Sequence, residues 1–282
     1  MSMKMNTKRR VSSGAIIIIM TGLSITSLFP FLWMLSTSLK EKAHALDFPP
    51  QWIPNPLTFT AYLDVWEVSP LLSGIINSFF IAVPVLILGS FVSALGAFAF
   101  SKMDIPHKNA LFMGLLSAMM IPGAVTMIPQ YVVWGSLGLT DTFVPLILPG
   151  LFGNVAMMFF LRQFLNGTPN EFIDSAKIDG CGFFMIFVRI YLPIMKPALA
   201  TQVIFWFMGI WNDFLGPLIY LDSEKNYTVQ LALRLLNALS ESTSEYPMIM
   251  AGSVISSLPL ILLFIGFQKY FVQSMALTGI KG

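Results

Sequence analysis

Charged residues are scarce in this chain of 282 residues. Asp, Glu, Lys and Arg make up 11% of it, whereas 56% of its residues are hydrophobic. A soluble domain of this length carries charge on roughly a quarter of its residues. The deficit therefore excludes an ordinary water-soluble domain and indicates that lipid surrounds much of the chain. The net charge of +2 gives no reason to expect a nucleic-acid partner.

Cysteine and histidine are nearly absent as well. The single cysteine, Cys181, excludes a disulfide within the chain and fits a reducing compartment. The two histidines, His44 and His107, are far apart in the sequence, and no metal site can be read from them. The chain also lacks the G-x-x-x-x-G-K-[ST] phosphate-binding pattern. We therefore expect it to bind no ATP, no metal and no other cofactor itself.

Long apolar runs, by contrast, take up about half of the chain. A membrane-spanning helix needs about 20 mostly apolar residues. Six runs qualify, each bounded by charge or by Pro, Gly and Asn clusters. They cover residues 14–36, 74–99, 110–129, 142–163, 193–221 and 247–268. The sequence predicts an all-α membrane protein with six transmembrane helices in a domain spanning 14–268, with no sizeable soluble domain.

The first run is longer than the 7–15-residue core of a signal peptide and no small-x-small cleavage site follows it, so we expect it to remain as a helix.

The basic residues predict how these runs are oriented. Lys and Arg collect in cytoplasmic loops. With the N-terminus inside, the basic residues left in outer segments are only Lys40, Lys42, Lys225 and Arg234. We therefore expect four cytoplasmic segments, namely the tails 1–13 and 269–282, the short turn 101–109 and the loop 164–192.

Two regions are expected to depart from simple spans. Pro122 and Pro129, at the end of the third run, free backbone carbonyls. They predict either a kink or an irregular helix that lines a path. Between the fifth and sixth runs, apolar residues recur at helical spacing. These residues are Val229, Leu233, Leu236 and Leu239. They predict a short amphipathic helix on the outer face, either on the lipid surface or in a platform for an external protein.

The loop between the fourth and fifth runs carries the most specific pattern in the chain. It reads TPNEFIDSAKIDGCGFFMIFVRIYLPIMKP, starting at Thr168. Thr168 is predicted to cap a short helix that begins at Pro169, with Glu171 completing a capping box. Gly180 is expected to end this helix in a left-handed conformation. A second helical piece should then lead to Pro193, which suits the first turn of the fifth span.

The spacing in this loop resembles the EAA loop of ABC importer permeases, which reads E-A-A-x3-G-x9-I-x-L-P. Here the pattern is Asp174-Ser175-Ala176, then Gly180, then I-x-L-P ending at Pro193. Asp and Ser stand in place of the usual Glu and first Ala. In that family a separate ATPase acts on this loop, which implies an ATPase-coupling role here. The residues concerned are Glu171, Asp174, Ser175, Ala176, Lys177, Asp179, Gly180 and Pro193.

Two further stretches resemble the carbohydrate branch of that family, in particular the six-span permease of maltose importers. Residues 211–218 read WNDFLGPL, close to W-N-D/E-F-x-x-P-L, although Gly216 replaces a frequently bulky residue. The ending GFQKYFVQSMALTGIKG is similar to the tail of that permease. The resemblance implies the ABC type I importer permease fold in a bacterial or archaeal cell membrane.

The same resemblance implies a set of partners. They are a second, related permease, two ATP-binding subunits that hold ATP and Mg, and an extracytoplasmic solute-binding protein that delivers a sugar. ATP binding would then move the coupling helices and switch the shared pore from inward-facing to outward-facing.

Asp213 is the one carboxylate within a predicted span. A charge there usually faces a protein interior or water. We expect it either on the substrate path, with Asn77, Trp211 and Asn212 as companions, or at the boundary near the outer headgroups.

Other classes of protein remain open. A secondary transporter or channel needs intramembrane acids or broken helices as ion sites, for which Asp213 alone is thin support. A membrane enzyme needs a cluster of His, Asp, Glu or Ser at a membrane face, and the sequence shows none. A permease for a non-sugar solute, such as an amino acid or peptide, is disfavoured by the WNDFLGPL stretch and the tail.

Overall fold

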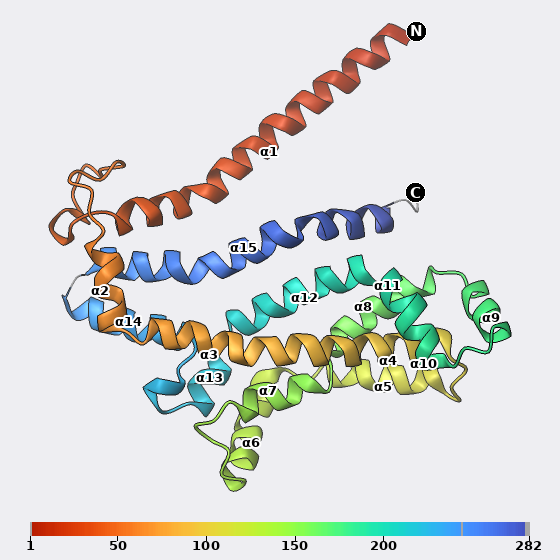
Figure 1. The fold of residues 1–282 in the computed structure, drawn as a ribbon. Coiled ribbons are helices and arrows are strands. Elements are labelled where there is room, and N and C mark those ends of the chain that lie inside the picture. Colours follow the sequence, from red (N-terminus) through yellow and green to blue (C-terminus); the bar gives the residue numbers. More distant parts are fainter. Residues whose placement is uncertain (1, 244, 280–282) are drawn as a thin grey trace. The chain divides into compact units, whose positions relative to one another are not determined.

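The structure is a computed structural model that describes residues 2–243 and 245–279. Within these ranges the regular elements are all helices, and no β-strand occurs among them, which confirms the predicted all-α class (Figure 1). The chain divides into two compact units. The first unit holds the residues up to Ser69 together with Leu233–Ser257. The second unit holds Pro70–Ala232 together with the described residues from Leu258 onward.

The first unit begins with one long helix, and a proline-rich connection follows it. Its elements are α1 (Ser2–Ser38), the 3-10 turn η1 (Lys42–His44), α2 (Thr60–Val68) and the adjoining parts of α14 (Val229–Thr243) and α15 (Tyr246–Gly279). The connection folds back on α1, because the Ser36 hydroxyl donates to the Trp52 carbonyl at 2.6 Å. The Trp52 ring lies 5.3 Å from the rings of both Phe29 and Trp33. The proline-rich connection is therefore packed against the end of α1.

The second unit is built on one continuous helix from Leu71 to Lys102. It consists of α3 (Leu71–Pro84), a π-helical stretch η2 (Val85–Gly89) and α4 (Ser90–Lys102). Next come α5 (Lys108–Ala118), α6 (Gly123–Ser136), α7 (Val144–Leu151) and α8 (Val155–Asn166). The loop region holds α9 (Glu171–Ile178), α10 (Phe183–Ile186), the π-helical η3 (Phe187–Tyr191) and α11 (Leu192–Ile194). The remaining elements are α12 (Lys196–Trp211), α13 (Leu215–Tyr220) and η4 (Glu224–Asn226).

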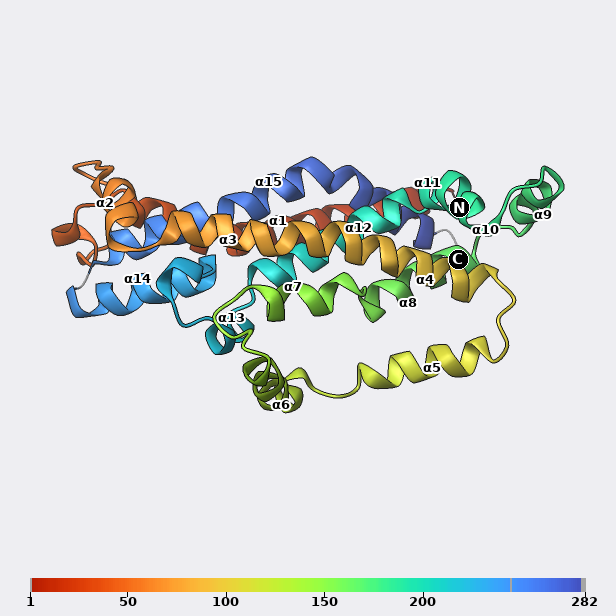
Figure 2. The ribbon, with the colours of Figure 1, turned by 60° about the horizontal axis from the view of Figure 1, so that its bottom comes forward.

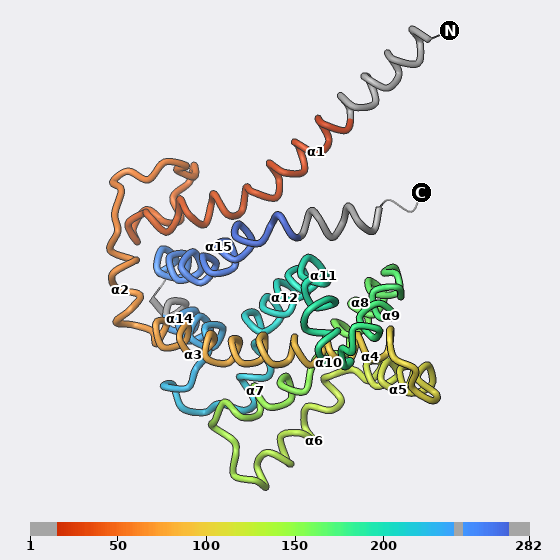
Figure 3. The backbone as a smooth tube through the Cα atoms, turned by 45° about the vertical axis from the view of Figure 1, so that its right-hand side comes forward, coloured from red at the N-terminus to blue at the C-terminus, as the bar shows by residue number. Residues whose placement is uncertain are grey.

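The described residues hold four helices long and apolar enough to cross a membrane. These are Ile16–Ser38, Leu71–Lys102, Val144–Asn166 and Tyr246–Tyr270. Two further pairs pass the same test but are bent. Lys108–Ala118 and Gly123–Ser136 meet at 86°, and Phe183–Ile194 and Lys196–Trp211 meet at 77°. The backbone trace shows the turn between α5 and α6 (Figure 3). This turn ends at Pro122, so the chain departs from a straight span there, as both predicted alternatives required, whereas Pro129 lies inside α6.

Glycines let the helices of the second unit approach one another closely. A Cβ on Gly89 would lie 2.3 Å from the Gly150 carbonyl oxygen and 2.5 Å from the Trp206 ring. A Cβ on Gly74 would lie 3.1 Å from the Ala232 Cβ, in the first turn of α14. Side chains at Gly89 or Gly74 would push these elements apart. The first turn of the amphipathic helix therefore packs on α3.

The buried core of the second unit joins α4 and α8 to the loop region. Phe98 in α4 has its ring 5.5 Å from that of Phe187 and 5.2 Å from that of Tyr191, both in η3. Leu161 and Leu165 of α8 belong to the same buried cluster. The short helix α9 lies at the end of this unit where α4 ends (Figures 1 and 2). The core thus provides a base from which α9 projects.

Candidate functional site: the loop helix and its base

The helix α9 is held by one narrow apolar face. Ile173 and Ala176, three residues apart and so on one side of the helix, are 5% and 6% exposed and belong to the buried cluster of the second unit. The other side is open. Phe172 is 45% exposed and Ile178 is 87% exposed. Two buried side chains thus anchor this eight-residue helix, and its other side chains are exposed.

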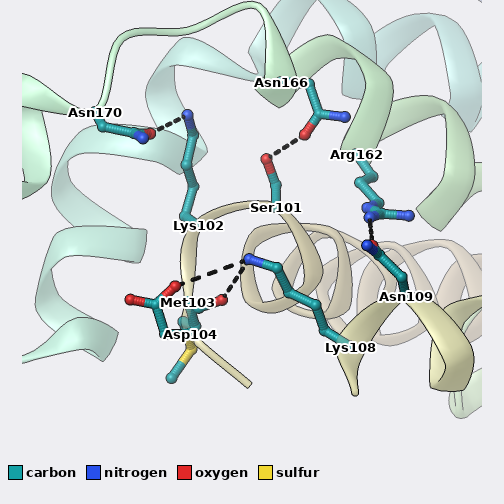
Figure 4. Close-up of polar contacts among 9 residues, drawn as sticks. All are labelled: Ser101, Lys102, Met103, Asp104, Lys108, Asn109, Arg162, Asn166 and Asn170. Carbon is teal, nitrogen blue, oxygen red and sulfur yellow. Dashed lines mark hydrogen bonds and ion pairs between the residues drawn. The ribbon is translucent and has the colours of Figure 1, made fainter. Parts of the chain in front are cut away.

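The segment before α9 is fixed by a lysine from a distant part of the sequence. Lys102, the last residue of α4, donates from Nζ to the Thr168 carbonyl at 2.7 Å and to Asn170 Oδ1 at 2.8 Å. Figure 4 shows this side chain reaching Asn170. The Tyr191 hydroxyl donates to the Pro169 carbonyl at 3.2 Å. The entry to α9 is therefore held from α4 and from η3.

Further polar contacts tie together the ends of α4, α5 and α8 that form this base (Figure 4). The Ser101 hydroxyl donates to Asn166 Oδ1 at 2.9 Å. Arg162 donates to Asn109 Oδ1 at 2.8 Å, and its guanidinium carbon lies 4.1 Å from the centre of the Phe112 ring. Among the described residues, Lys108 contacts the segment just before α5, donating to the Met103 carbonyl at 3.0 Å. Three helix ends thus form one connected base beneath the loop.

The capping box predicted at Thr168 is wrong. The helix begins at Glu171, and the Thr168 hydroxyl instead donates to the Leu165 carbonyl at the end of α8. Asn170 stands directly before the helix, but its side-chain oxygen accepts from Lys102. The sequence contains the right residue types, but a neighbouring helix and a distant lysine compete for them.

The end of α9 agrees with the sequence prediction. Gly180 has φ +77°, its N–H donates to the Lys177 carbonyl at 3.0 Å, and the Cys181 N–H donates to the Ala176 carbonyl at 2.9 Å. This pair of bonds is the Schellman motif, in which a left-handed glycine follows the last helical turn. No described atom lies within 4 Å of the place that a Gly180 Cβ would take. The glycine is therefore required by backbone conformation, not by crowding within this chain.

The predicted coupling residues fall into two groups. Most of them are exposed around α9 and the turn that follows it, and Pro193 is exposed in α11. The exposed members are Glu171, Asp174, Ser175, Lys177, Asp179, Gly180 and Pro193. Ala176 faces inward, so its small size serves packing of α9 on its own base. Sequence reasoning missed Phe172 and Ile178, although the inward spacing of Ile173 and Ala176 leaves them on the open side. It also missed Lys102, whose role depends on a contact that no local pattern reveals.

The predicted path residues do not share one site. The Asn77 amide donates to the carbonyls of Lys225 and Tyr227, each at 2.9 Å, and so fixes the segment before α14. Trp211 is 1% exposed and packs on Phe79, with ring centres 5.0 Å apart.

The other two predicted path residues, Asn212 and Asp213, also have different surroundings. Asn212 donates to the Met208 carbonyl at 2.9 Å and accepts from Gln230 at 3.4 Å. Asp213 lines a cavity of about 370 Å³, whose lining does not include the other three residues.

A second carboxylate, Asp141, joins the loop after α6 to the segment after α13. It accepts the N–H groups of Asp222 at 3.0 Å and Ser223 at 2.9 Å, as well as the Ser223 hydroxyl. The Ser223 hydroxyl and N–H, helped by the bonds from Asn226 and Asp222, hold the pKa of the Asp141 carboxyl well below its usual range. The ionised carboxylate thus fastens these two segments together. Among the described residues, no group of three His, Cys, Asp or Glu side chains is placed to hold a metal ion.

Comparison with known proteins shows which family has this architecture. Residues 1–277 match the family described as "Binding-protein-dependent transport system inner membrane component". The arabinooligosaccharides transport system permease protein AraQ of Bacillus subtilis is 34% identical over 263 residues, covering 92% of each chain. The melibiose/raffinose/stachyose import permease protein MelC of the same organism is 29% identical, covering 99% of this chain and 100% of MelC.

A solved structure shares the fold. It belongs to a bacterial ABC transporter involved in the import of the acidic polysaccharide alginate. It matches with a TM-score of 0.80 at 22% identity, covering 94% of this chain and 98% of that one. Together with the apolar helices and the projecting loop helix, these matches support the resemblance read from the loop. The chain therefore belongs to the family of binding-protein-dependent transport system inner membrane components, the membrane-embedded permeases of ABC importers.

Proposed function

We propose that this chain forms half of the translocation path for an oligosaccharide or related sugar in an ATP-driven importer. AraQ and MelC, which are similar to it over nearly their whole length, are named for the transport of such sugars. The WNDFLGPL stretch over residues 211–218 adds support from the sequence itself. A sugar is therefore the cargo that best agrees with both observations.

We propose a six-span topology with both termini in the cytoplasm. Four long apolar helices and two bent pairs overlap the six runs found in the sequence. The basic residues of the tails 1–13 and 269–282 and of the loop 164–192 would then share one side of the membrane. The transmembrane domain 14–268 would lie between the two tails.

The observation that carries the proposal is the way in which α9 is mounted. A helix can transmit force only if it protrudes and is fixed to a rigid base. Ile173 and Ala176 anchor α9 in the core, and Lys102 fixes its entry, while Glu171, Asp174 and the other exposed coupling residues surround it. This arrangement supports docking of α9 on an ATPase subunit, where ATP and Mg are held by the partner.

The remaining partners follow from the same function. One bundle of this size encloses no complete pore by itself in the proposed mechanism, so a second, related permease forms the other half. Two ATPase subunits would contact the two loops, and an extracytoplasmic binding protein would deliver the solute. Binding of ATP would close the ATPase pair, displace α9 and turn the path outward.

Purification from the native host tests this proposal. The tagged chain is extracted in mild detergent, and co-purifying chains are identified by mass spectrometry. We expect a second multispan permease and an ATPase with a phosphate-binding loop. Recovery of this chain alone, or only as a homo-oligomer, under conditions that preserve other membrane complexes would instead favour a secondary transporter.

A further inference from the structure

A cavity of about 370 Å³ lies inside the second unit, away from the loop helix. The helices α3, α7, α12 and α13 and the residue Thr228 form its walls. Small-molecule sites in proteins have volumes of roughly 300–1,000 Å³ and combine apolar walls with a few polar groups. The volume is therefore in the range that accommodates one sugar ring.

The polar groups of the cavity accept and donate hydrogen bonds without supplying a positive charge. Asp213 contributes a carboxylate, one oxygen of which accepts the Gly216 N–H at 3.2 Å. Ser78 and Thr228 also line the cavity, and Ser78 carries a hydroxyl that can donate. No Lys, Arg or His occurs among the described residues that line the cavity. The wall thus suits a neutral, hydroxyl-rich solute better than an anion, because an anion would meet a carboxylate with no cation to balance it.

The two hydroxyl-bearing residues of this wall, Thr228 and Ser78, differ in what their side chains can contact. Thr228 is 5% exposed, and its oxygen has no hydrogen-bond partner among the described residues. Buried hydroxyls in proteins nearly always have such a partner. The neighbouring Ser78 hydroxyl accepts the Val229 N–H at 3.0 Å and keeps its own hydrogen to donate. The Ser78 hydroxyl can therefore donate to a solute in the cavity, whereas the Thr228 oxygen is buried out of reach of one.

Trp206 gives the cavity an aromatic wall at a fixed position. Its ring packs directly against the backbone at Gly89, where a Cβ would come within 2.5 Å of it. Trp206 and Gly209 both come from α12 and both line the cavity. No described atom lies within 4 Å of the place that a Gly209 Cβ would take, so this position faces open space. An indole ring offers a flat apolar face of the kind that packs against the C–H face of a sugar.

We propose that this cavity is a binding site for one neutral sugar residue of the transported solute. The sugar ring packs on Trp206, its hydroxyls donate to the Asp213 carboxylate, and a further hydroxyl accepts from Ser78. The proposal rests on the proposed function and adds two points to it. This chain contacts the solute directly, and it selects neutral sugars over acidic ones.

Filling the cavity tests the site. The complete importer, with its partner permease, ATPase and binding protein, is produced with Gly209→Leu or with the control Gly114→Leu. Gly114 lies in α5, away from the cavity, and its Cβ position is also open among the described residues. We expect Gly209→Leu to lower uptake of labelled raffinose or arabinotriose at least tenfold, with the four components co-purifying at normal yield. Gly114→Leu should remain within twofold of the unmodified importer.

A second substitution keeps the test independent of packing. Asp213→Asn preserves the shape of the side chain but weakens the acceptor, and we expect it to lower uptake of the same sugar at least fivefold. The unmodified importer should take up trigalacturonate at least tenfold more slowly than the preferred neutral sugar.

The outcomes separate the two proposals. If the unmodified importer transports a neutral sugar and both the Gly209→Leu and Asp213→Asn variants stay within twofold of it, the cavity is not a binding site although the proposed function stands. Faster uptake of trigalacturonate would overturn the choice of neutral sugars. If no ATPase co-purifies and no sugar is transported, the proposed function fails, and the cavity proposal fails with it.

Discussion

Removing the Lys102 ammonium should loosen the loop helix without unfolding the base. Lys102→Met keeps a long apolar stem but removes the two hydrogen bonds to the Thr168 carbonyl and Asn170 Oδ1, at 2.7 and 2.8 Å. Hydrogen bonds to a charged group contribute about 1.5–3 kcal/mol each when well buried. Lys102 is only partly buried, so we expect a total loss of about 1–3 kcal/mol from local stability.

Hydrogen–deuterium exchange in the purified importer measures this loss. Opening free energies of local segments set amide exchange rates, and each 1.4 kcal/mol corresponds to about a factor of ten. Amides over residues 167–181 should therefore exchange about 5- to 100-fold faster in Lys102→Met, and ATP hydrolysis stimulated by the binding protein should fall. Amides in the core of α4 should change little, because Phe98 and its neighbours keep their contacts.

Lys108→Met is the matched control. Lys108 lies at the same end of the second unit, but its described polar contacts are with the segment just before α5. It donates to the Met103 carbonyl and lies 4.0 Å from the Asp104 carboxylate. It should leave exchange over 167–181 within twofold of the unmodified protein. If Lys102→Met also left that exchange within twofold, or if Lys108→Met raised it equally, the idea that Lys102 holds the entry to α9 would be refuted.

Three further predictions concern single positions. Gly180→Asp should abolish uptake but not membrane insertion, because it puts a charged side chain beside the proposed coupling surface at φ +77°, a conformation that favours glycine; normal uptake, measured with the amount in the membrane, would contradict this role. The pKa of Asp141 is lowered in the folded state, so the carboxylate stabilises the fold fully above the unfolded pKa of about 4 and less as the pH falls below that value. Between pH 6 and pH 3 the melting temperature should therefore fall less steeply in Asp141→Asn than in the unmodified protein, and an equal slope in the two would contradict this role of Asp141. Asp213→Asn should lower uptake more than Asp222→Asn, whereas equal effects would favour a position near the outer headgroups.

Hydropathy was enough to locate the apolar helices, because a helix in lipid must satisfy its backbone hydrogen bonds within one continuous apolar segment. The break before Pro122 and the left-handed Gly180 were also readable, since proline and glycine act on their own backbone. The capping of α9 was not readable. Thr168 and Asn170 have the right chemistry for a cap, but Lys102, more than sixty residues earlier, takes the Asn170 oxygen.

The orientation of side chains within the loop was also beyond the sequence. A small residue such as Ala176 fits equally well at a partner surface or against its own core, and only the packed cluster shows that it faces inward. Likewise Asn77 has the chemistry of a solute contact, but its amide is used by two backbone carbonyls. The π-helical stretch at Val85–Gly89 was not predicted either; it follows Pro84 and ends at Gly89, which Gly150 approaches closely.

The position of the only cysteine makes this loop accessible to spectroscopy. Cys181 follows Gly180 directly, and its thiol is partly exposed. A maleimide dye or a nitroxide attached there would sit at the end of α9, and no other thiol in this chain would compete for the reagent. The native sequence thus provides a single reporter position from which movement of the loop helix can be followed during ATP turnover.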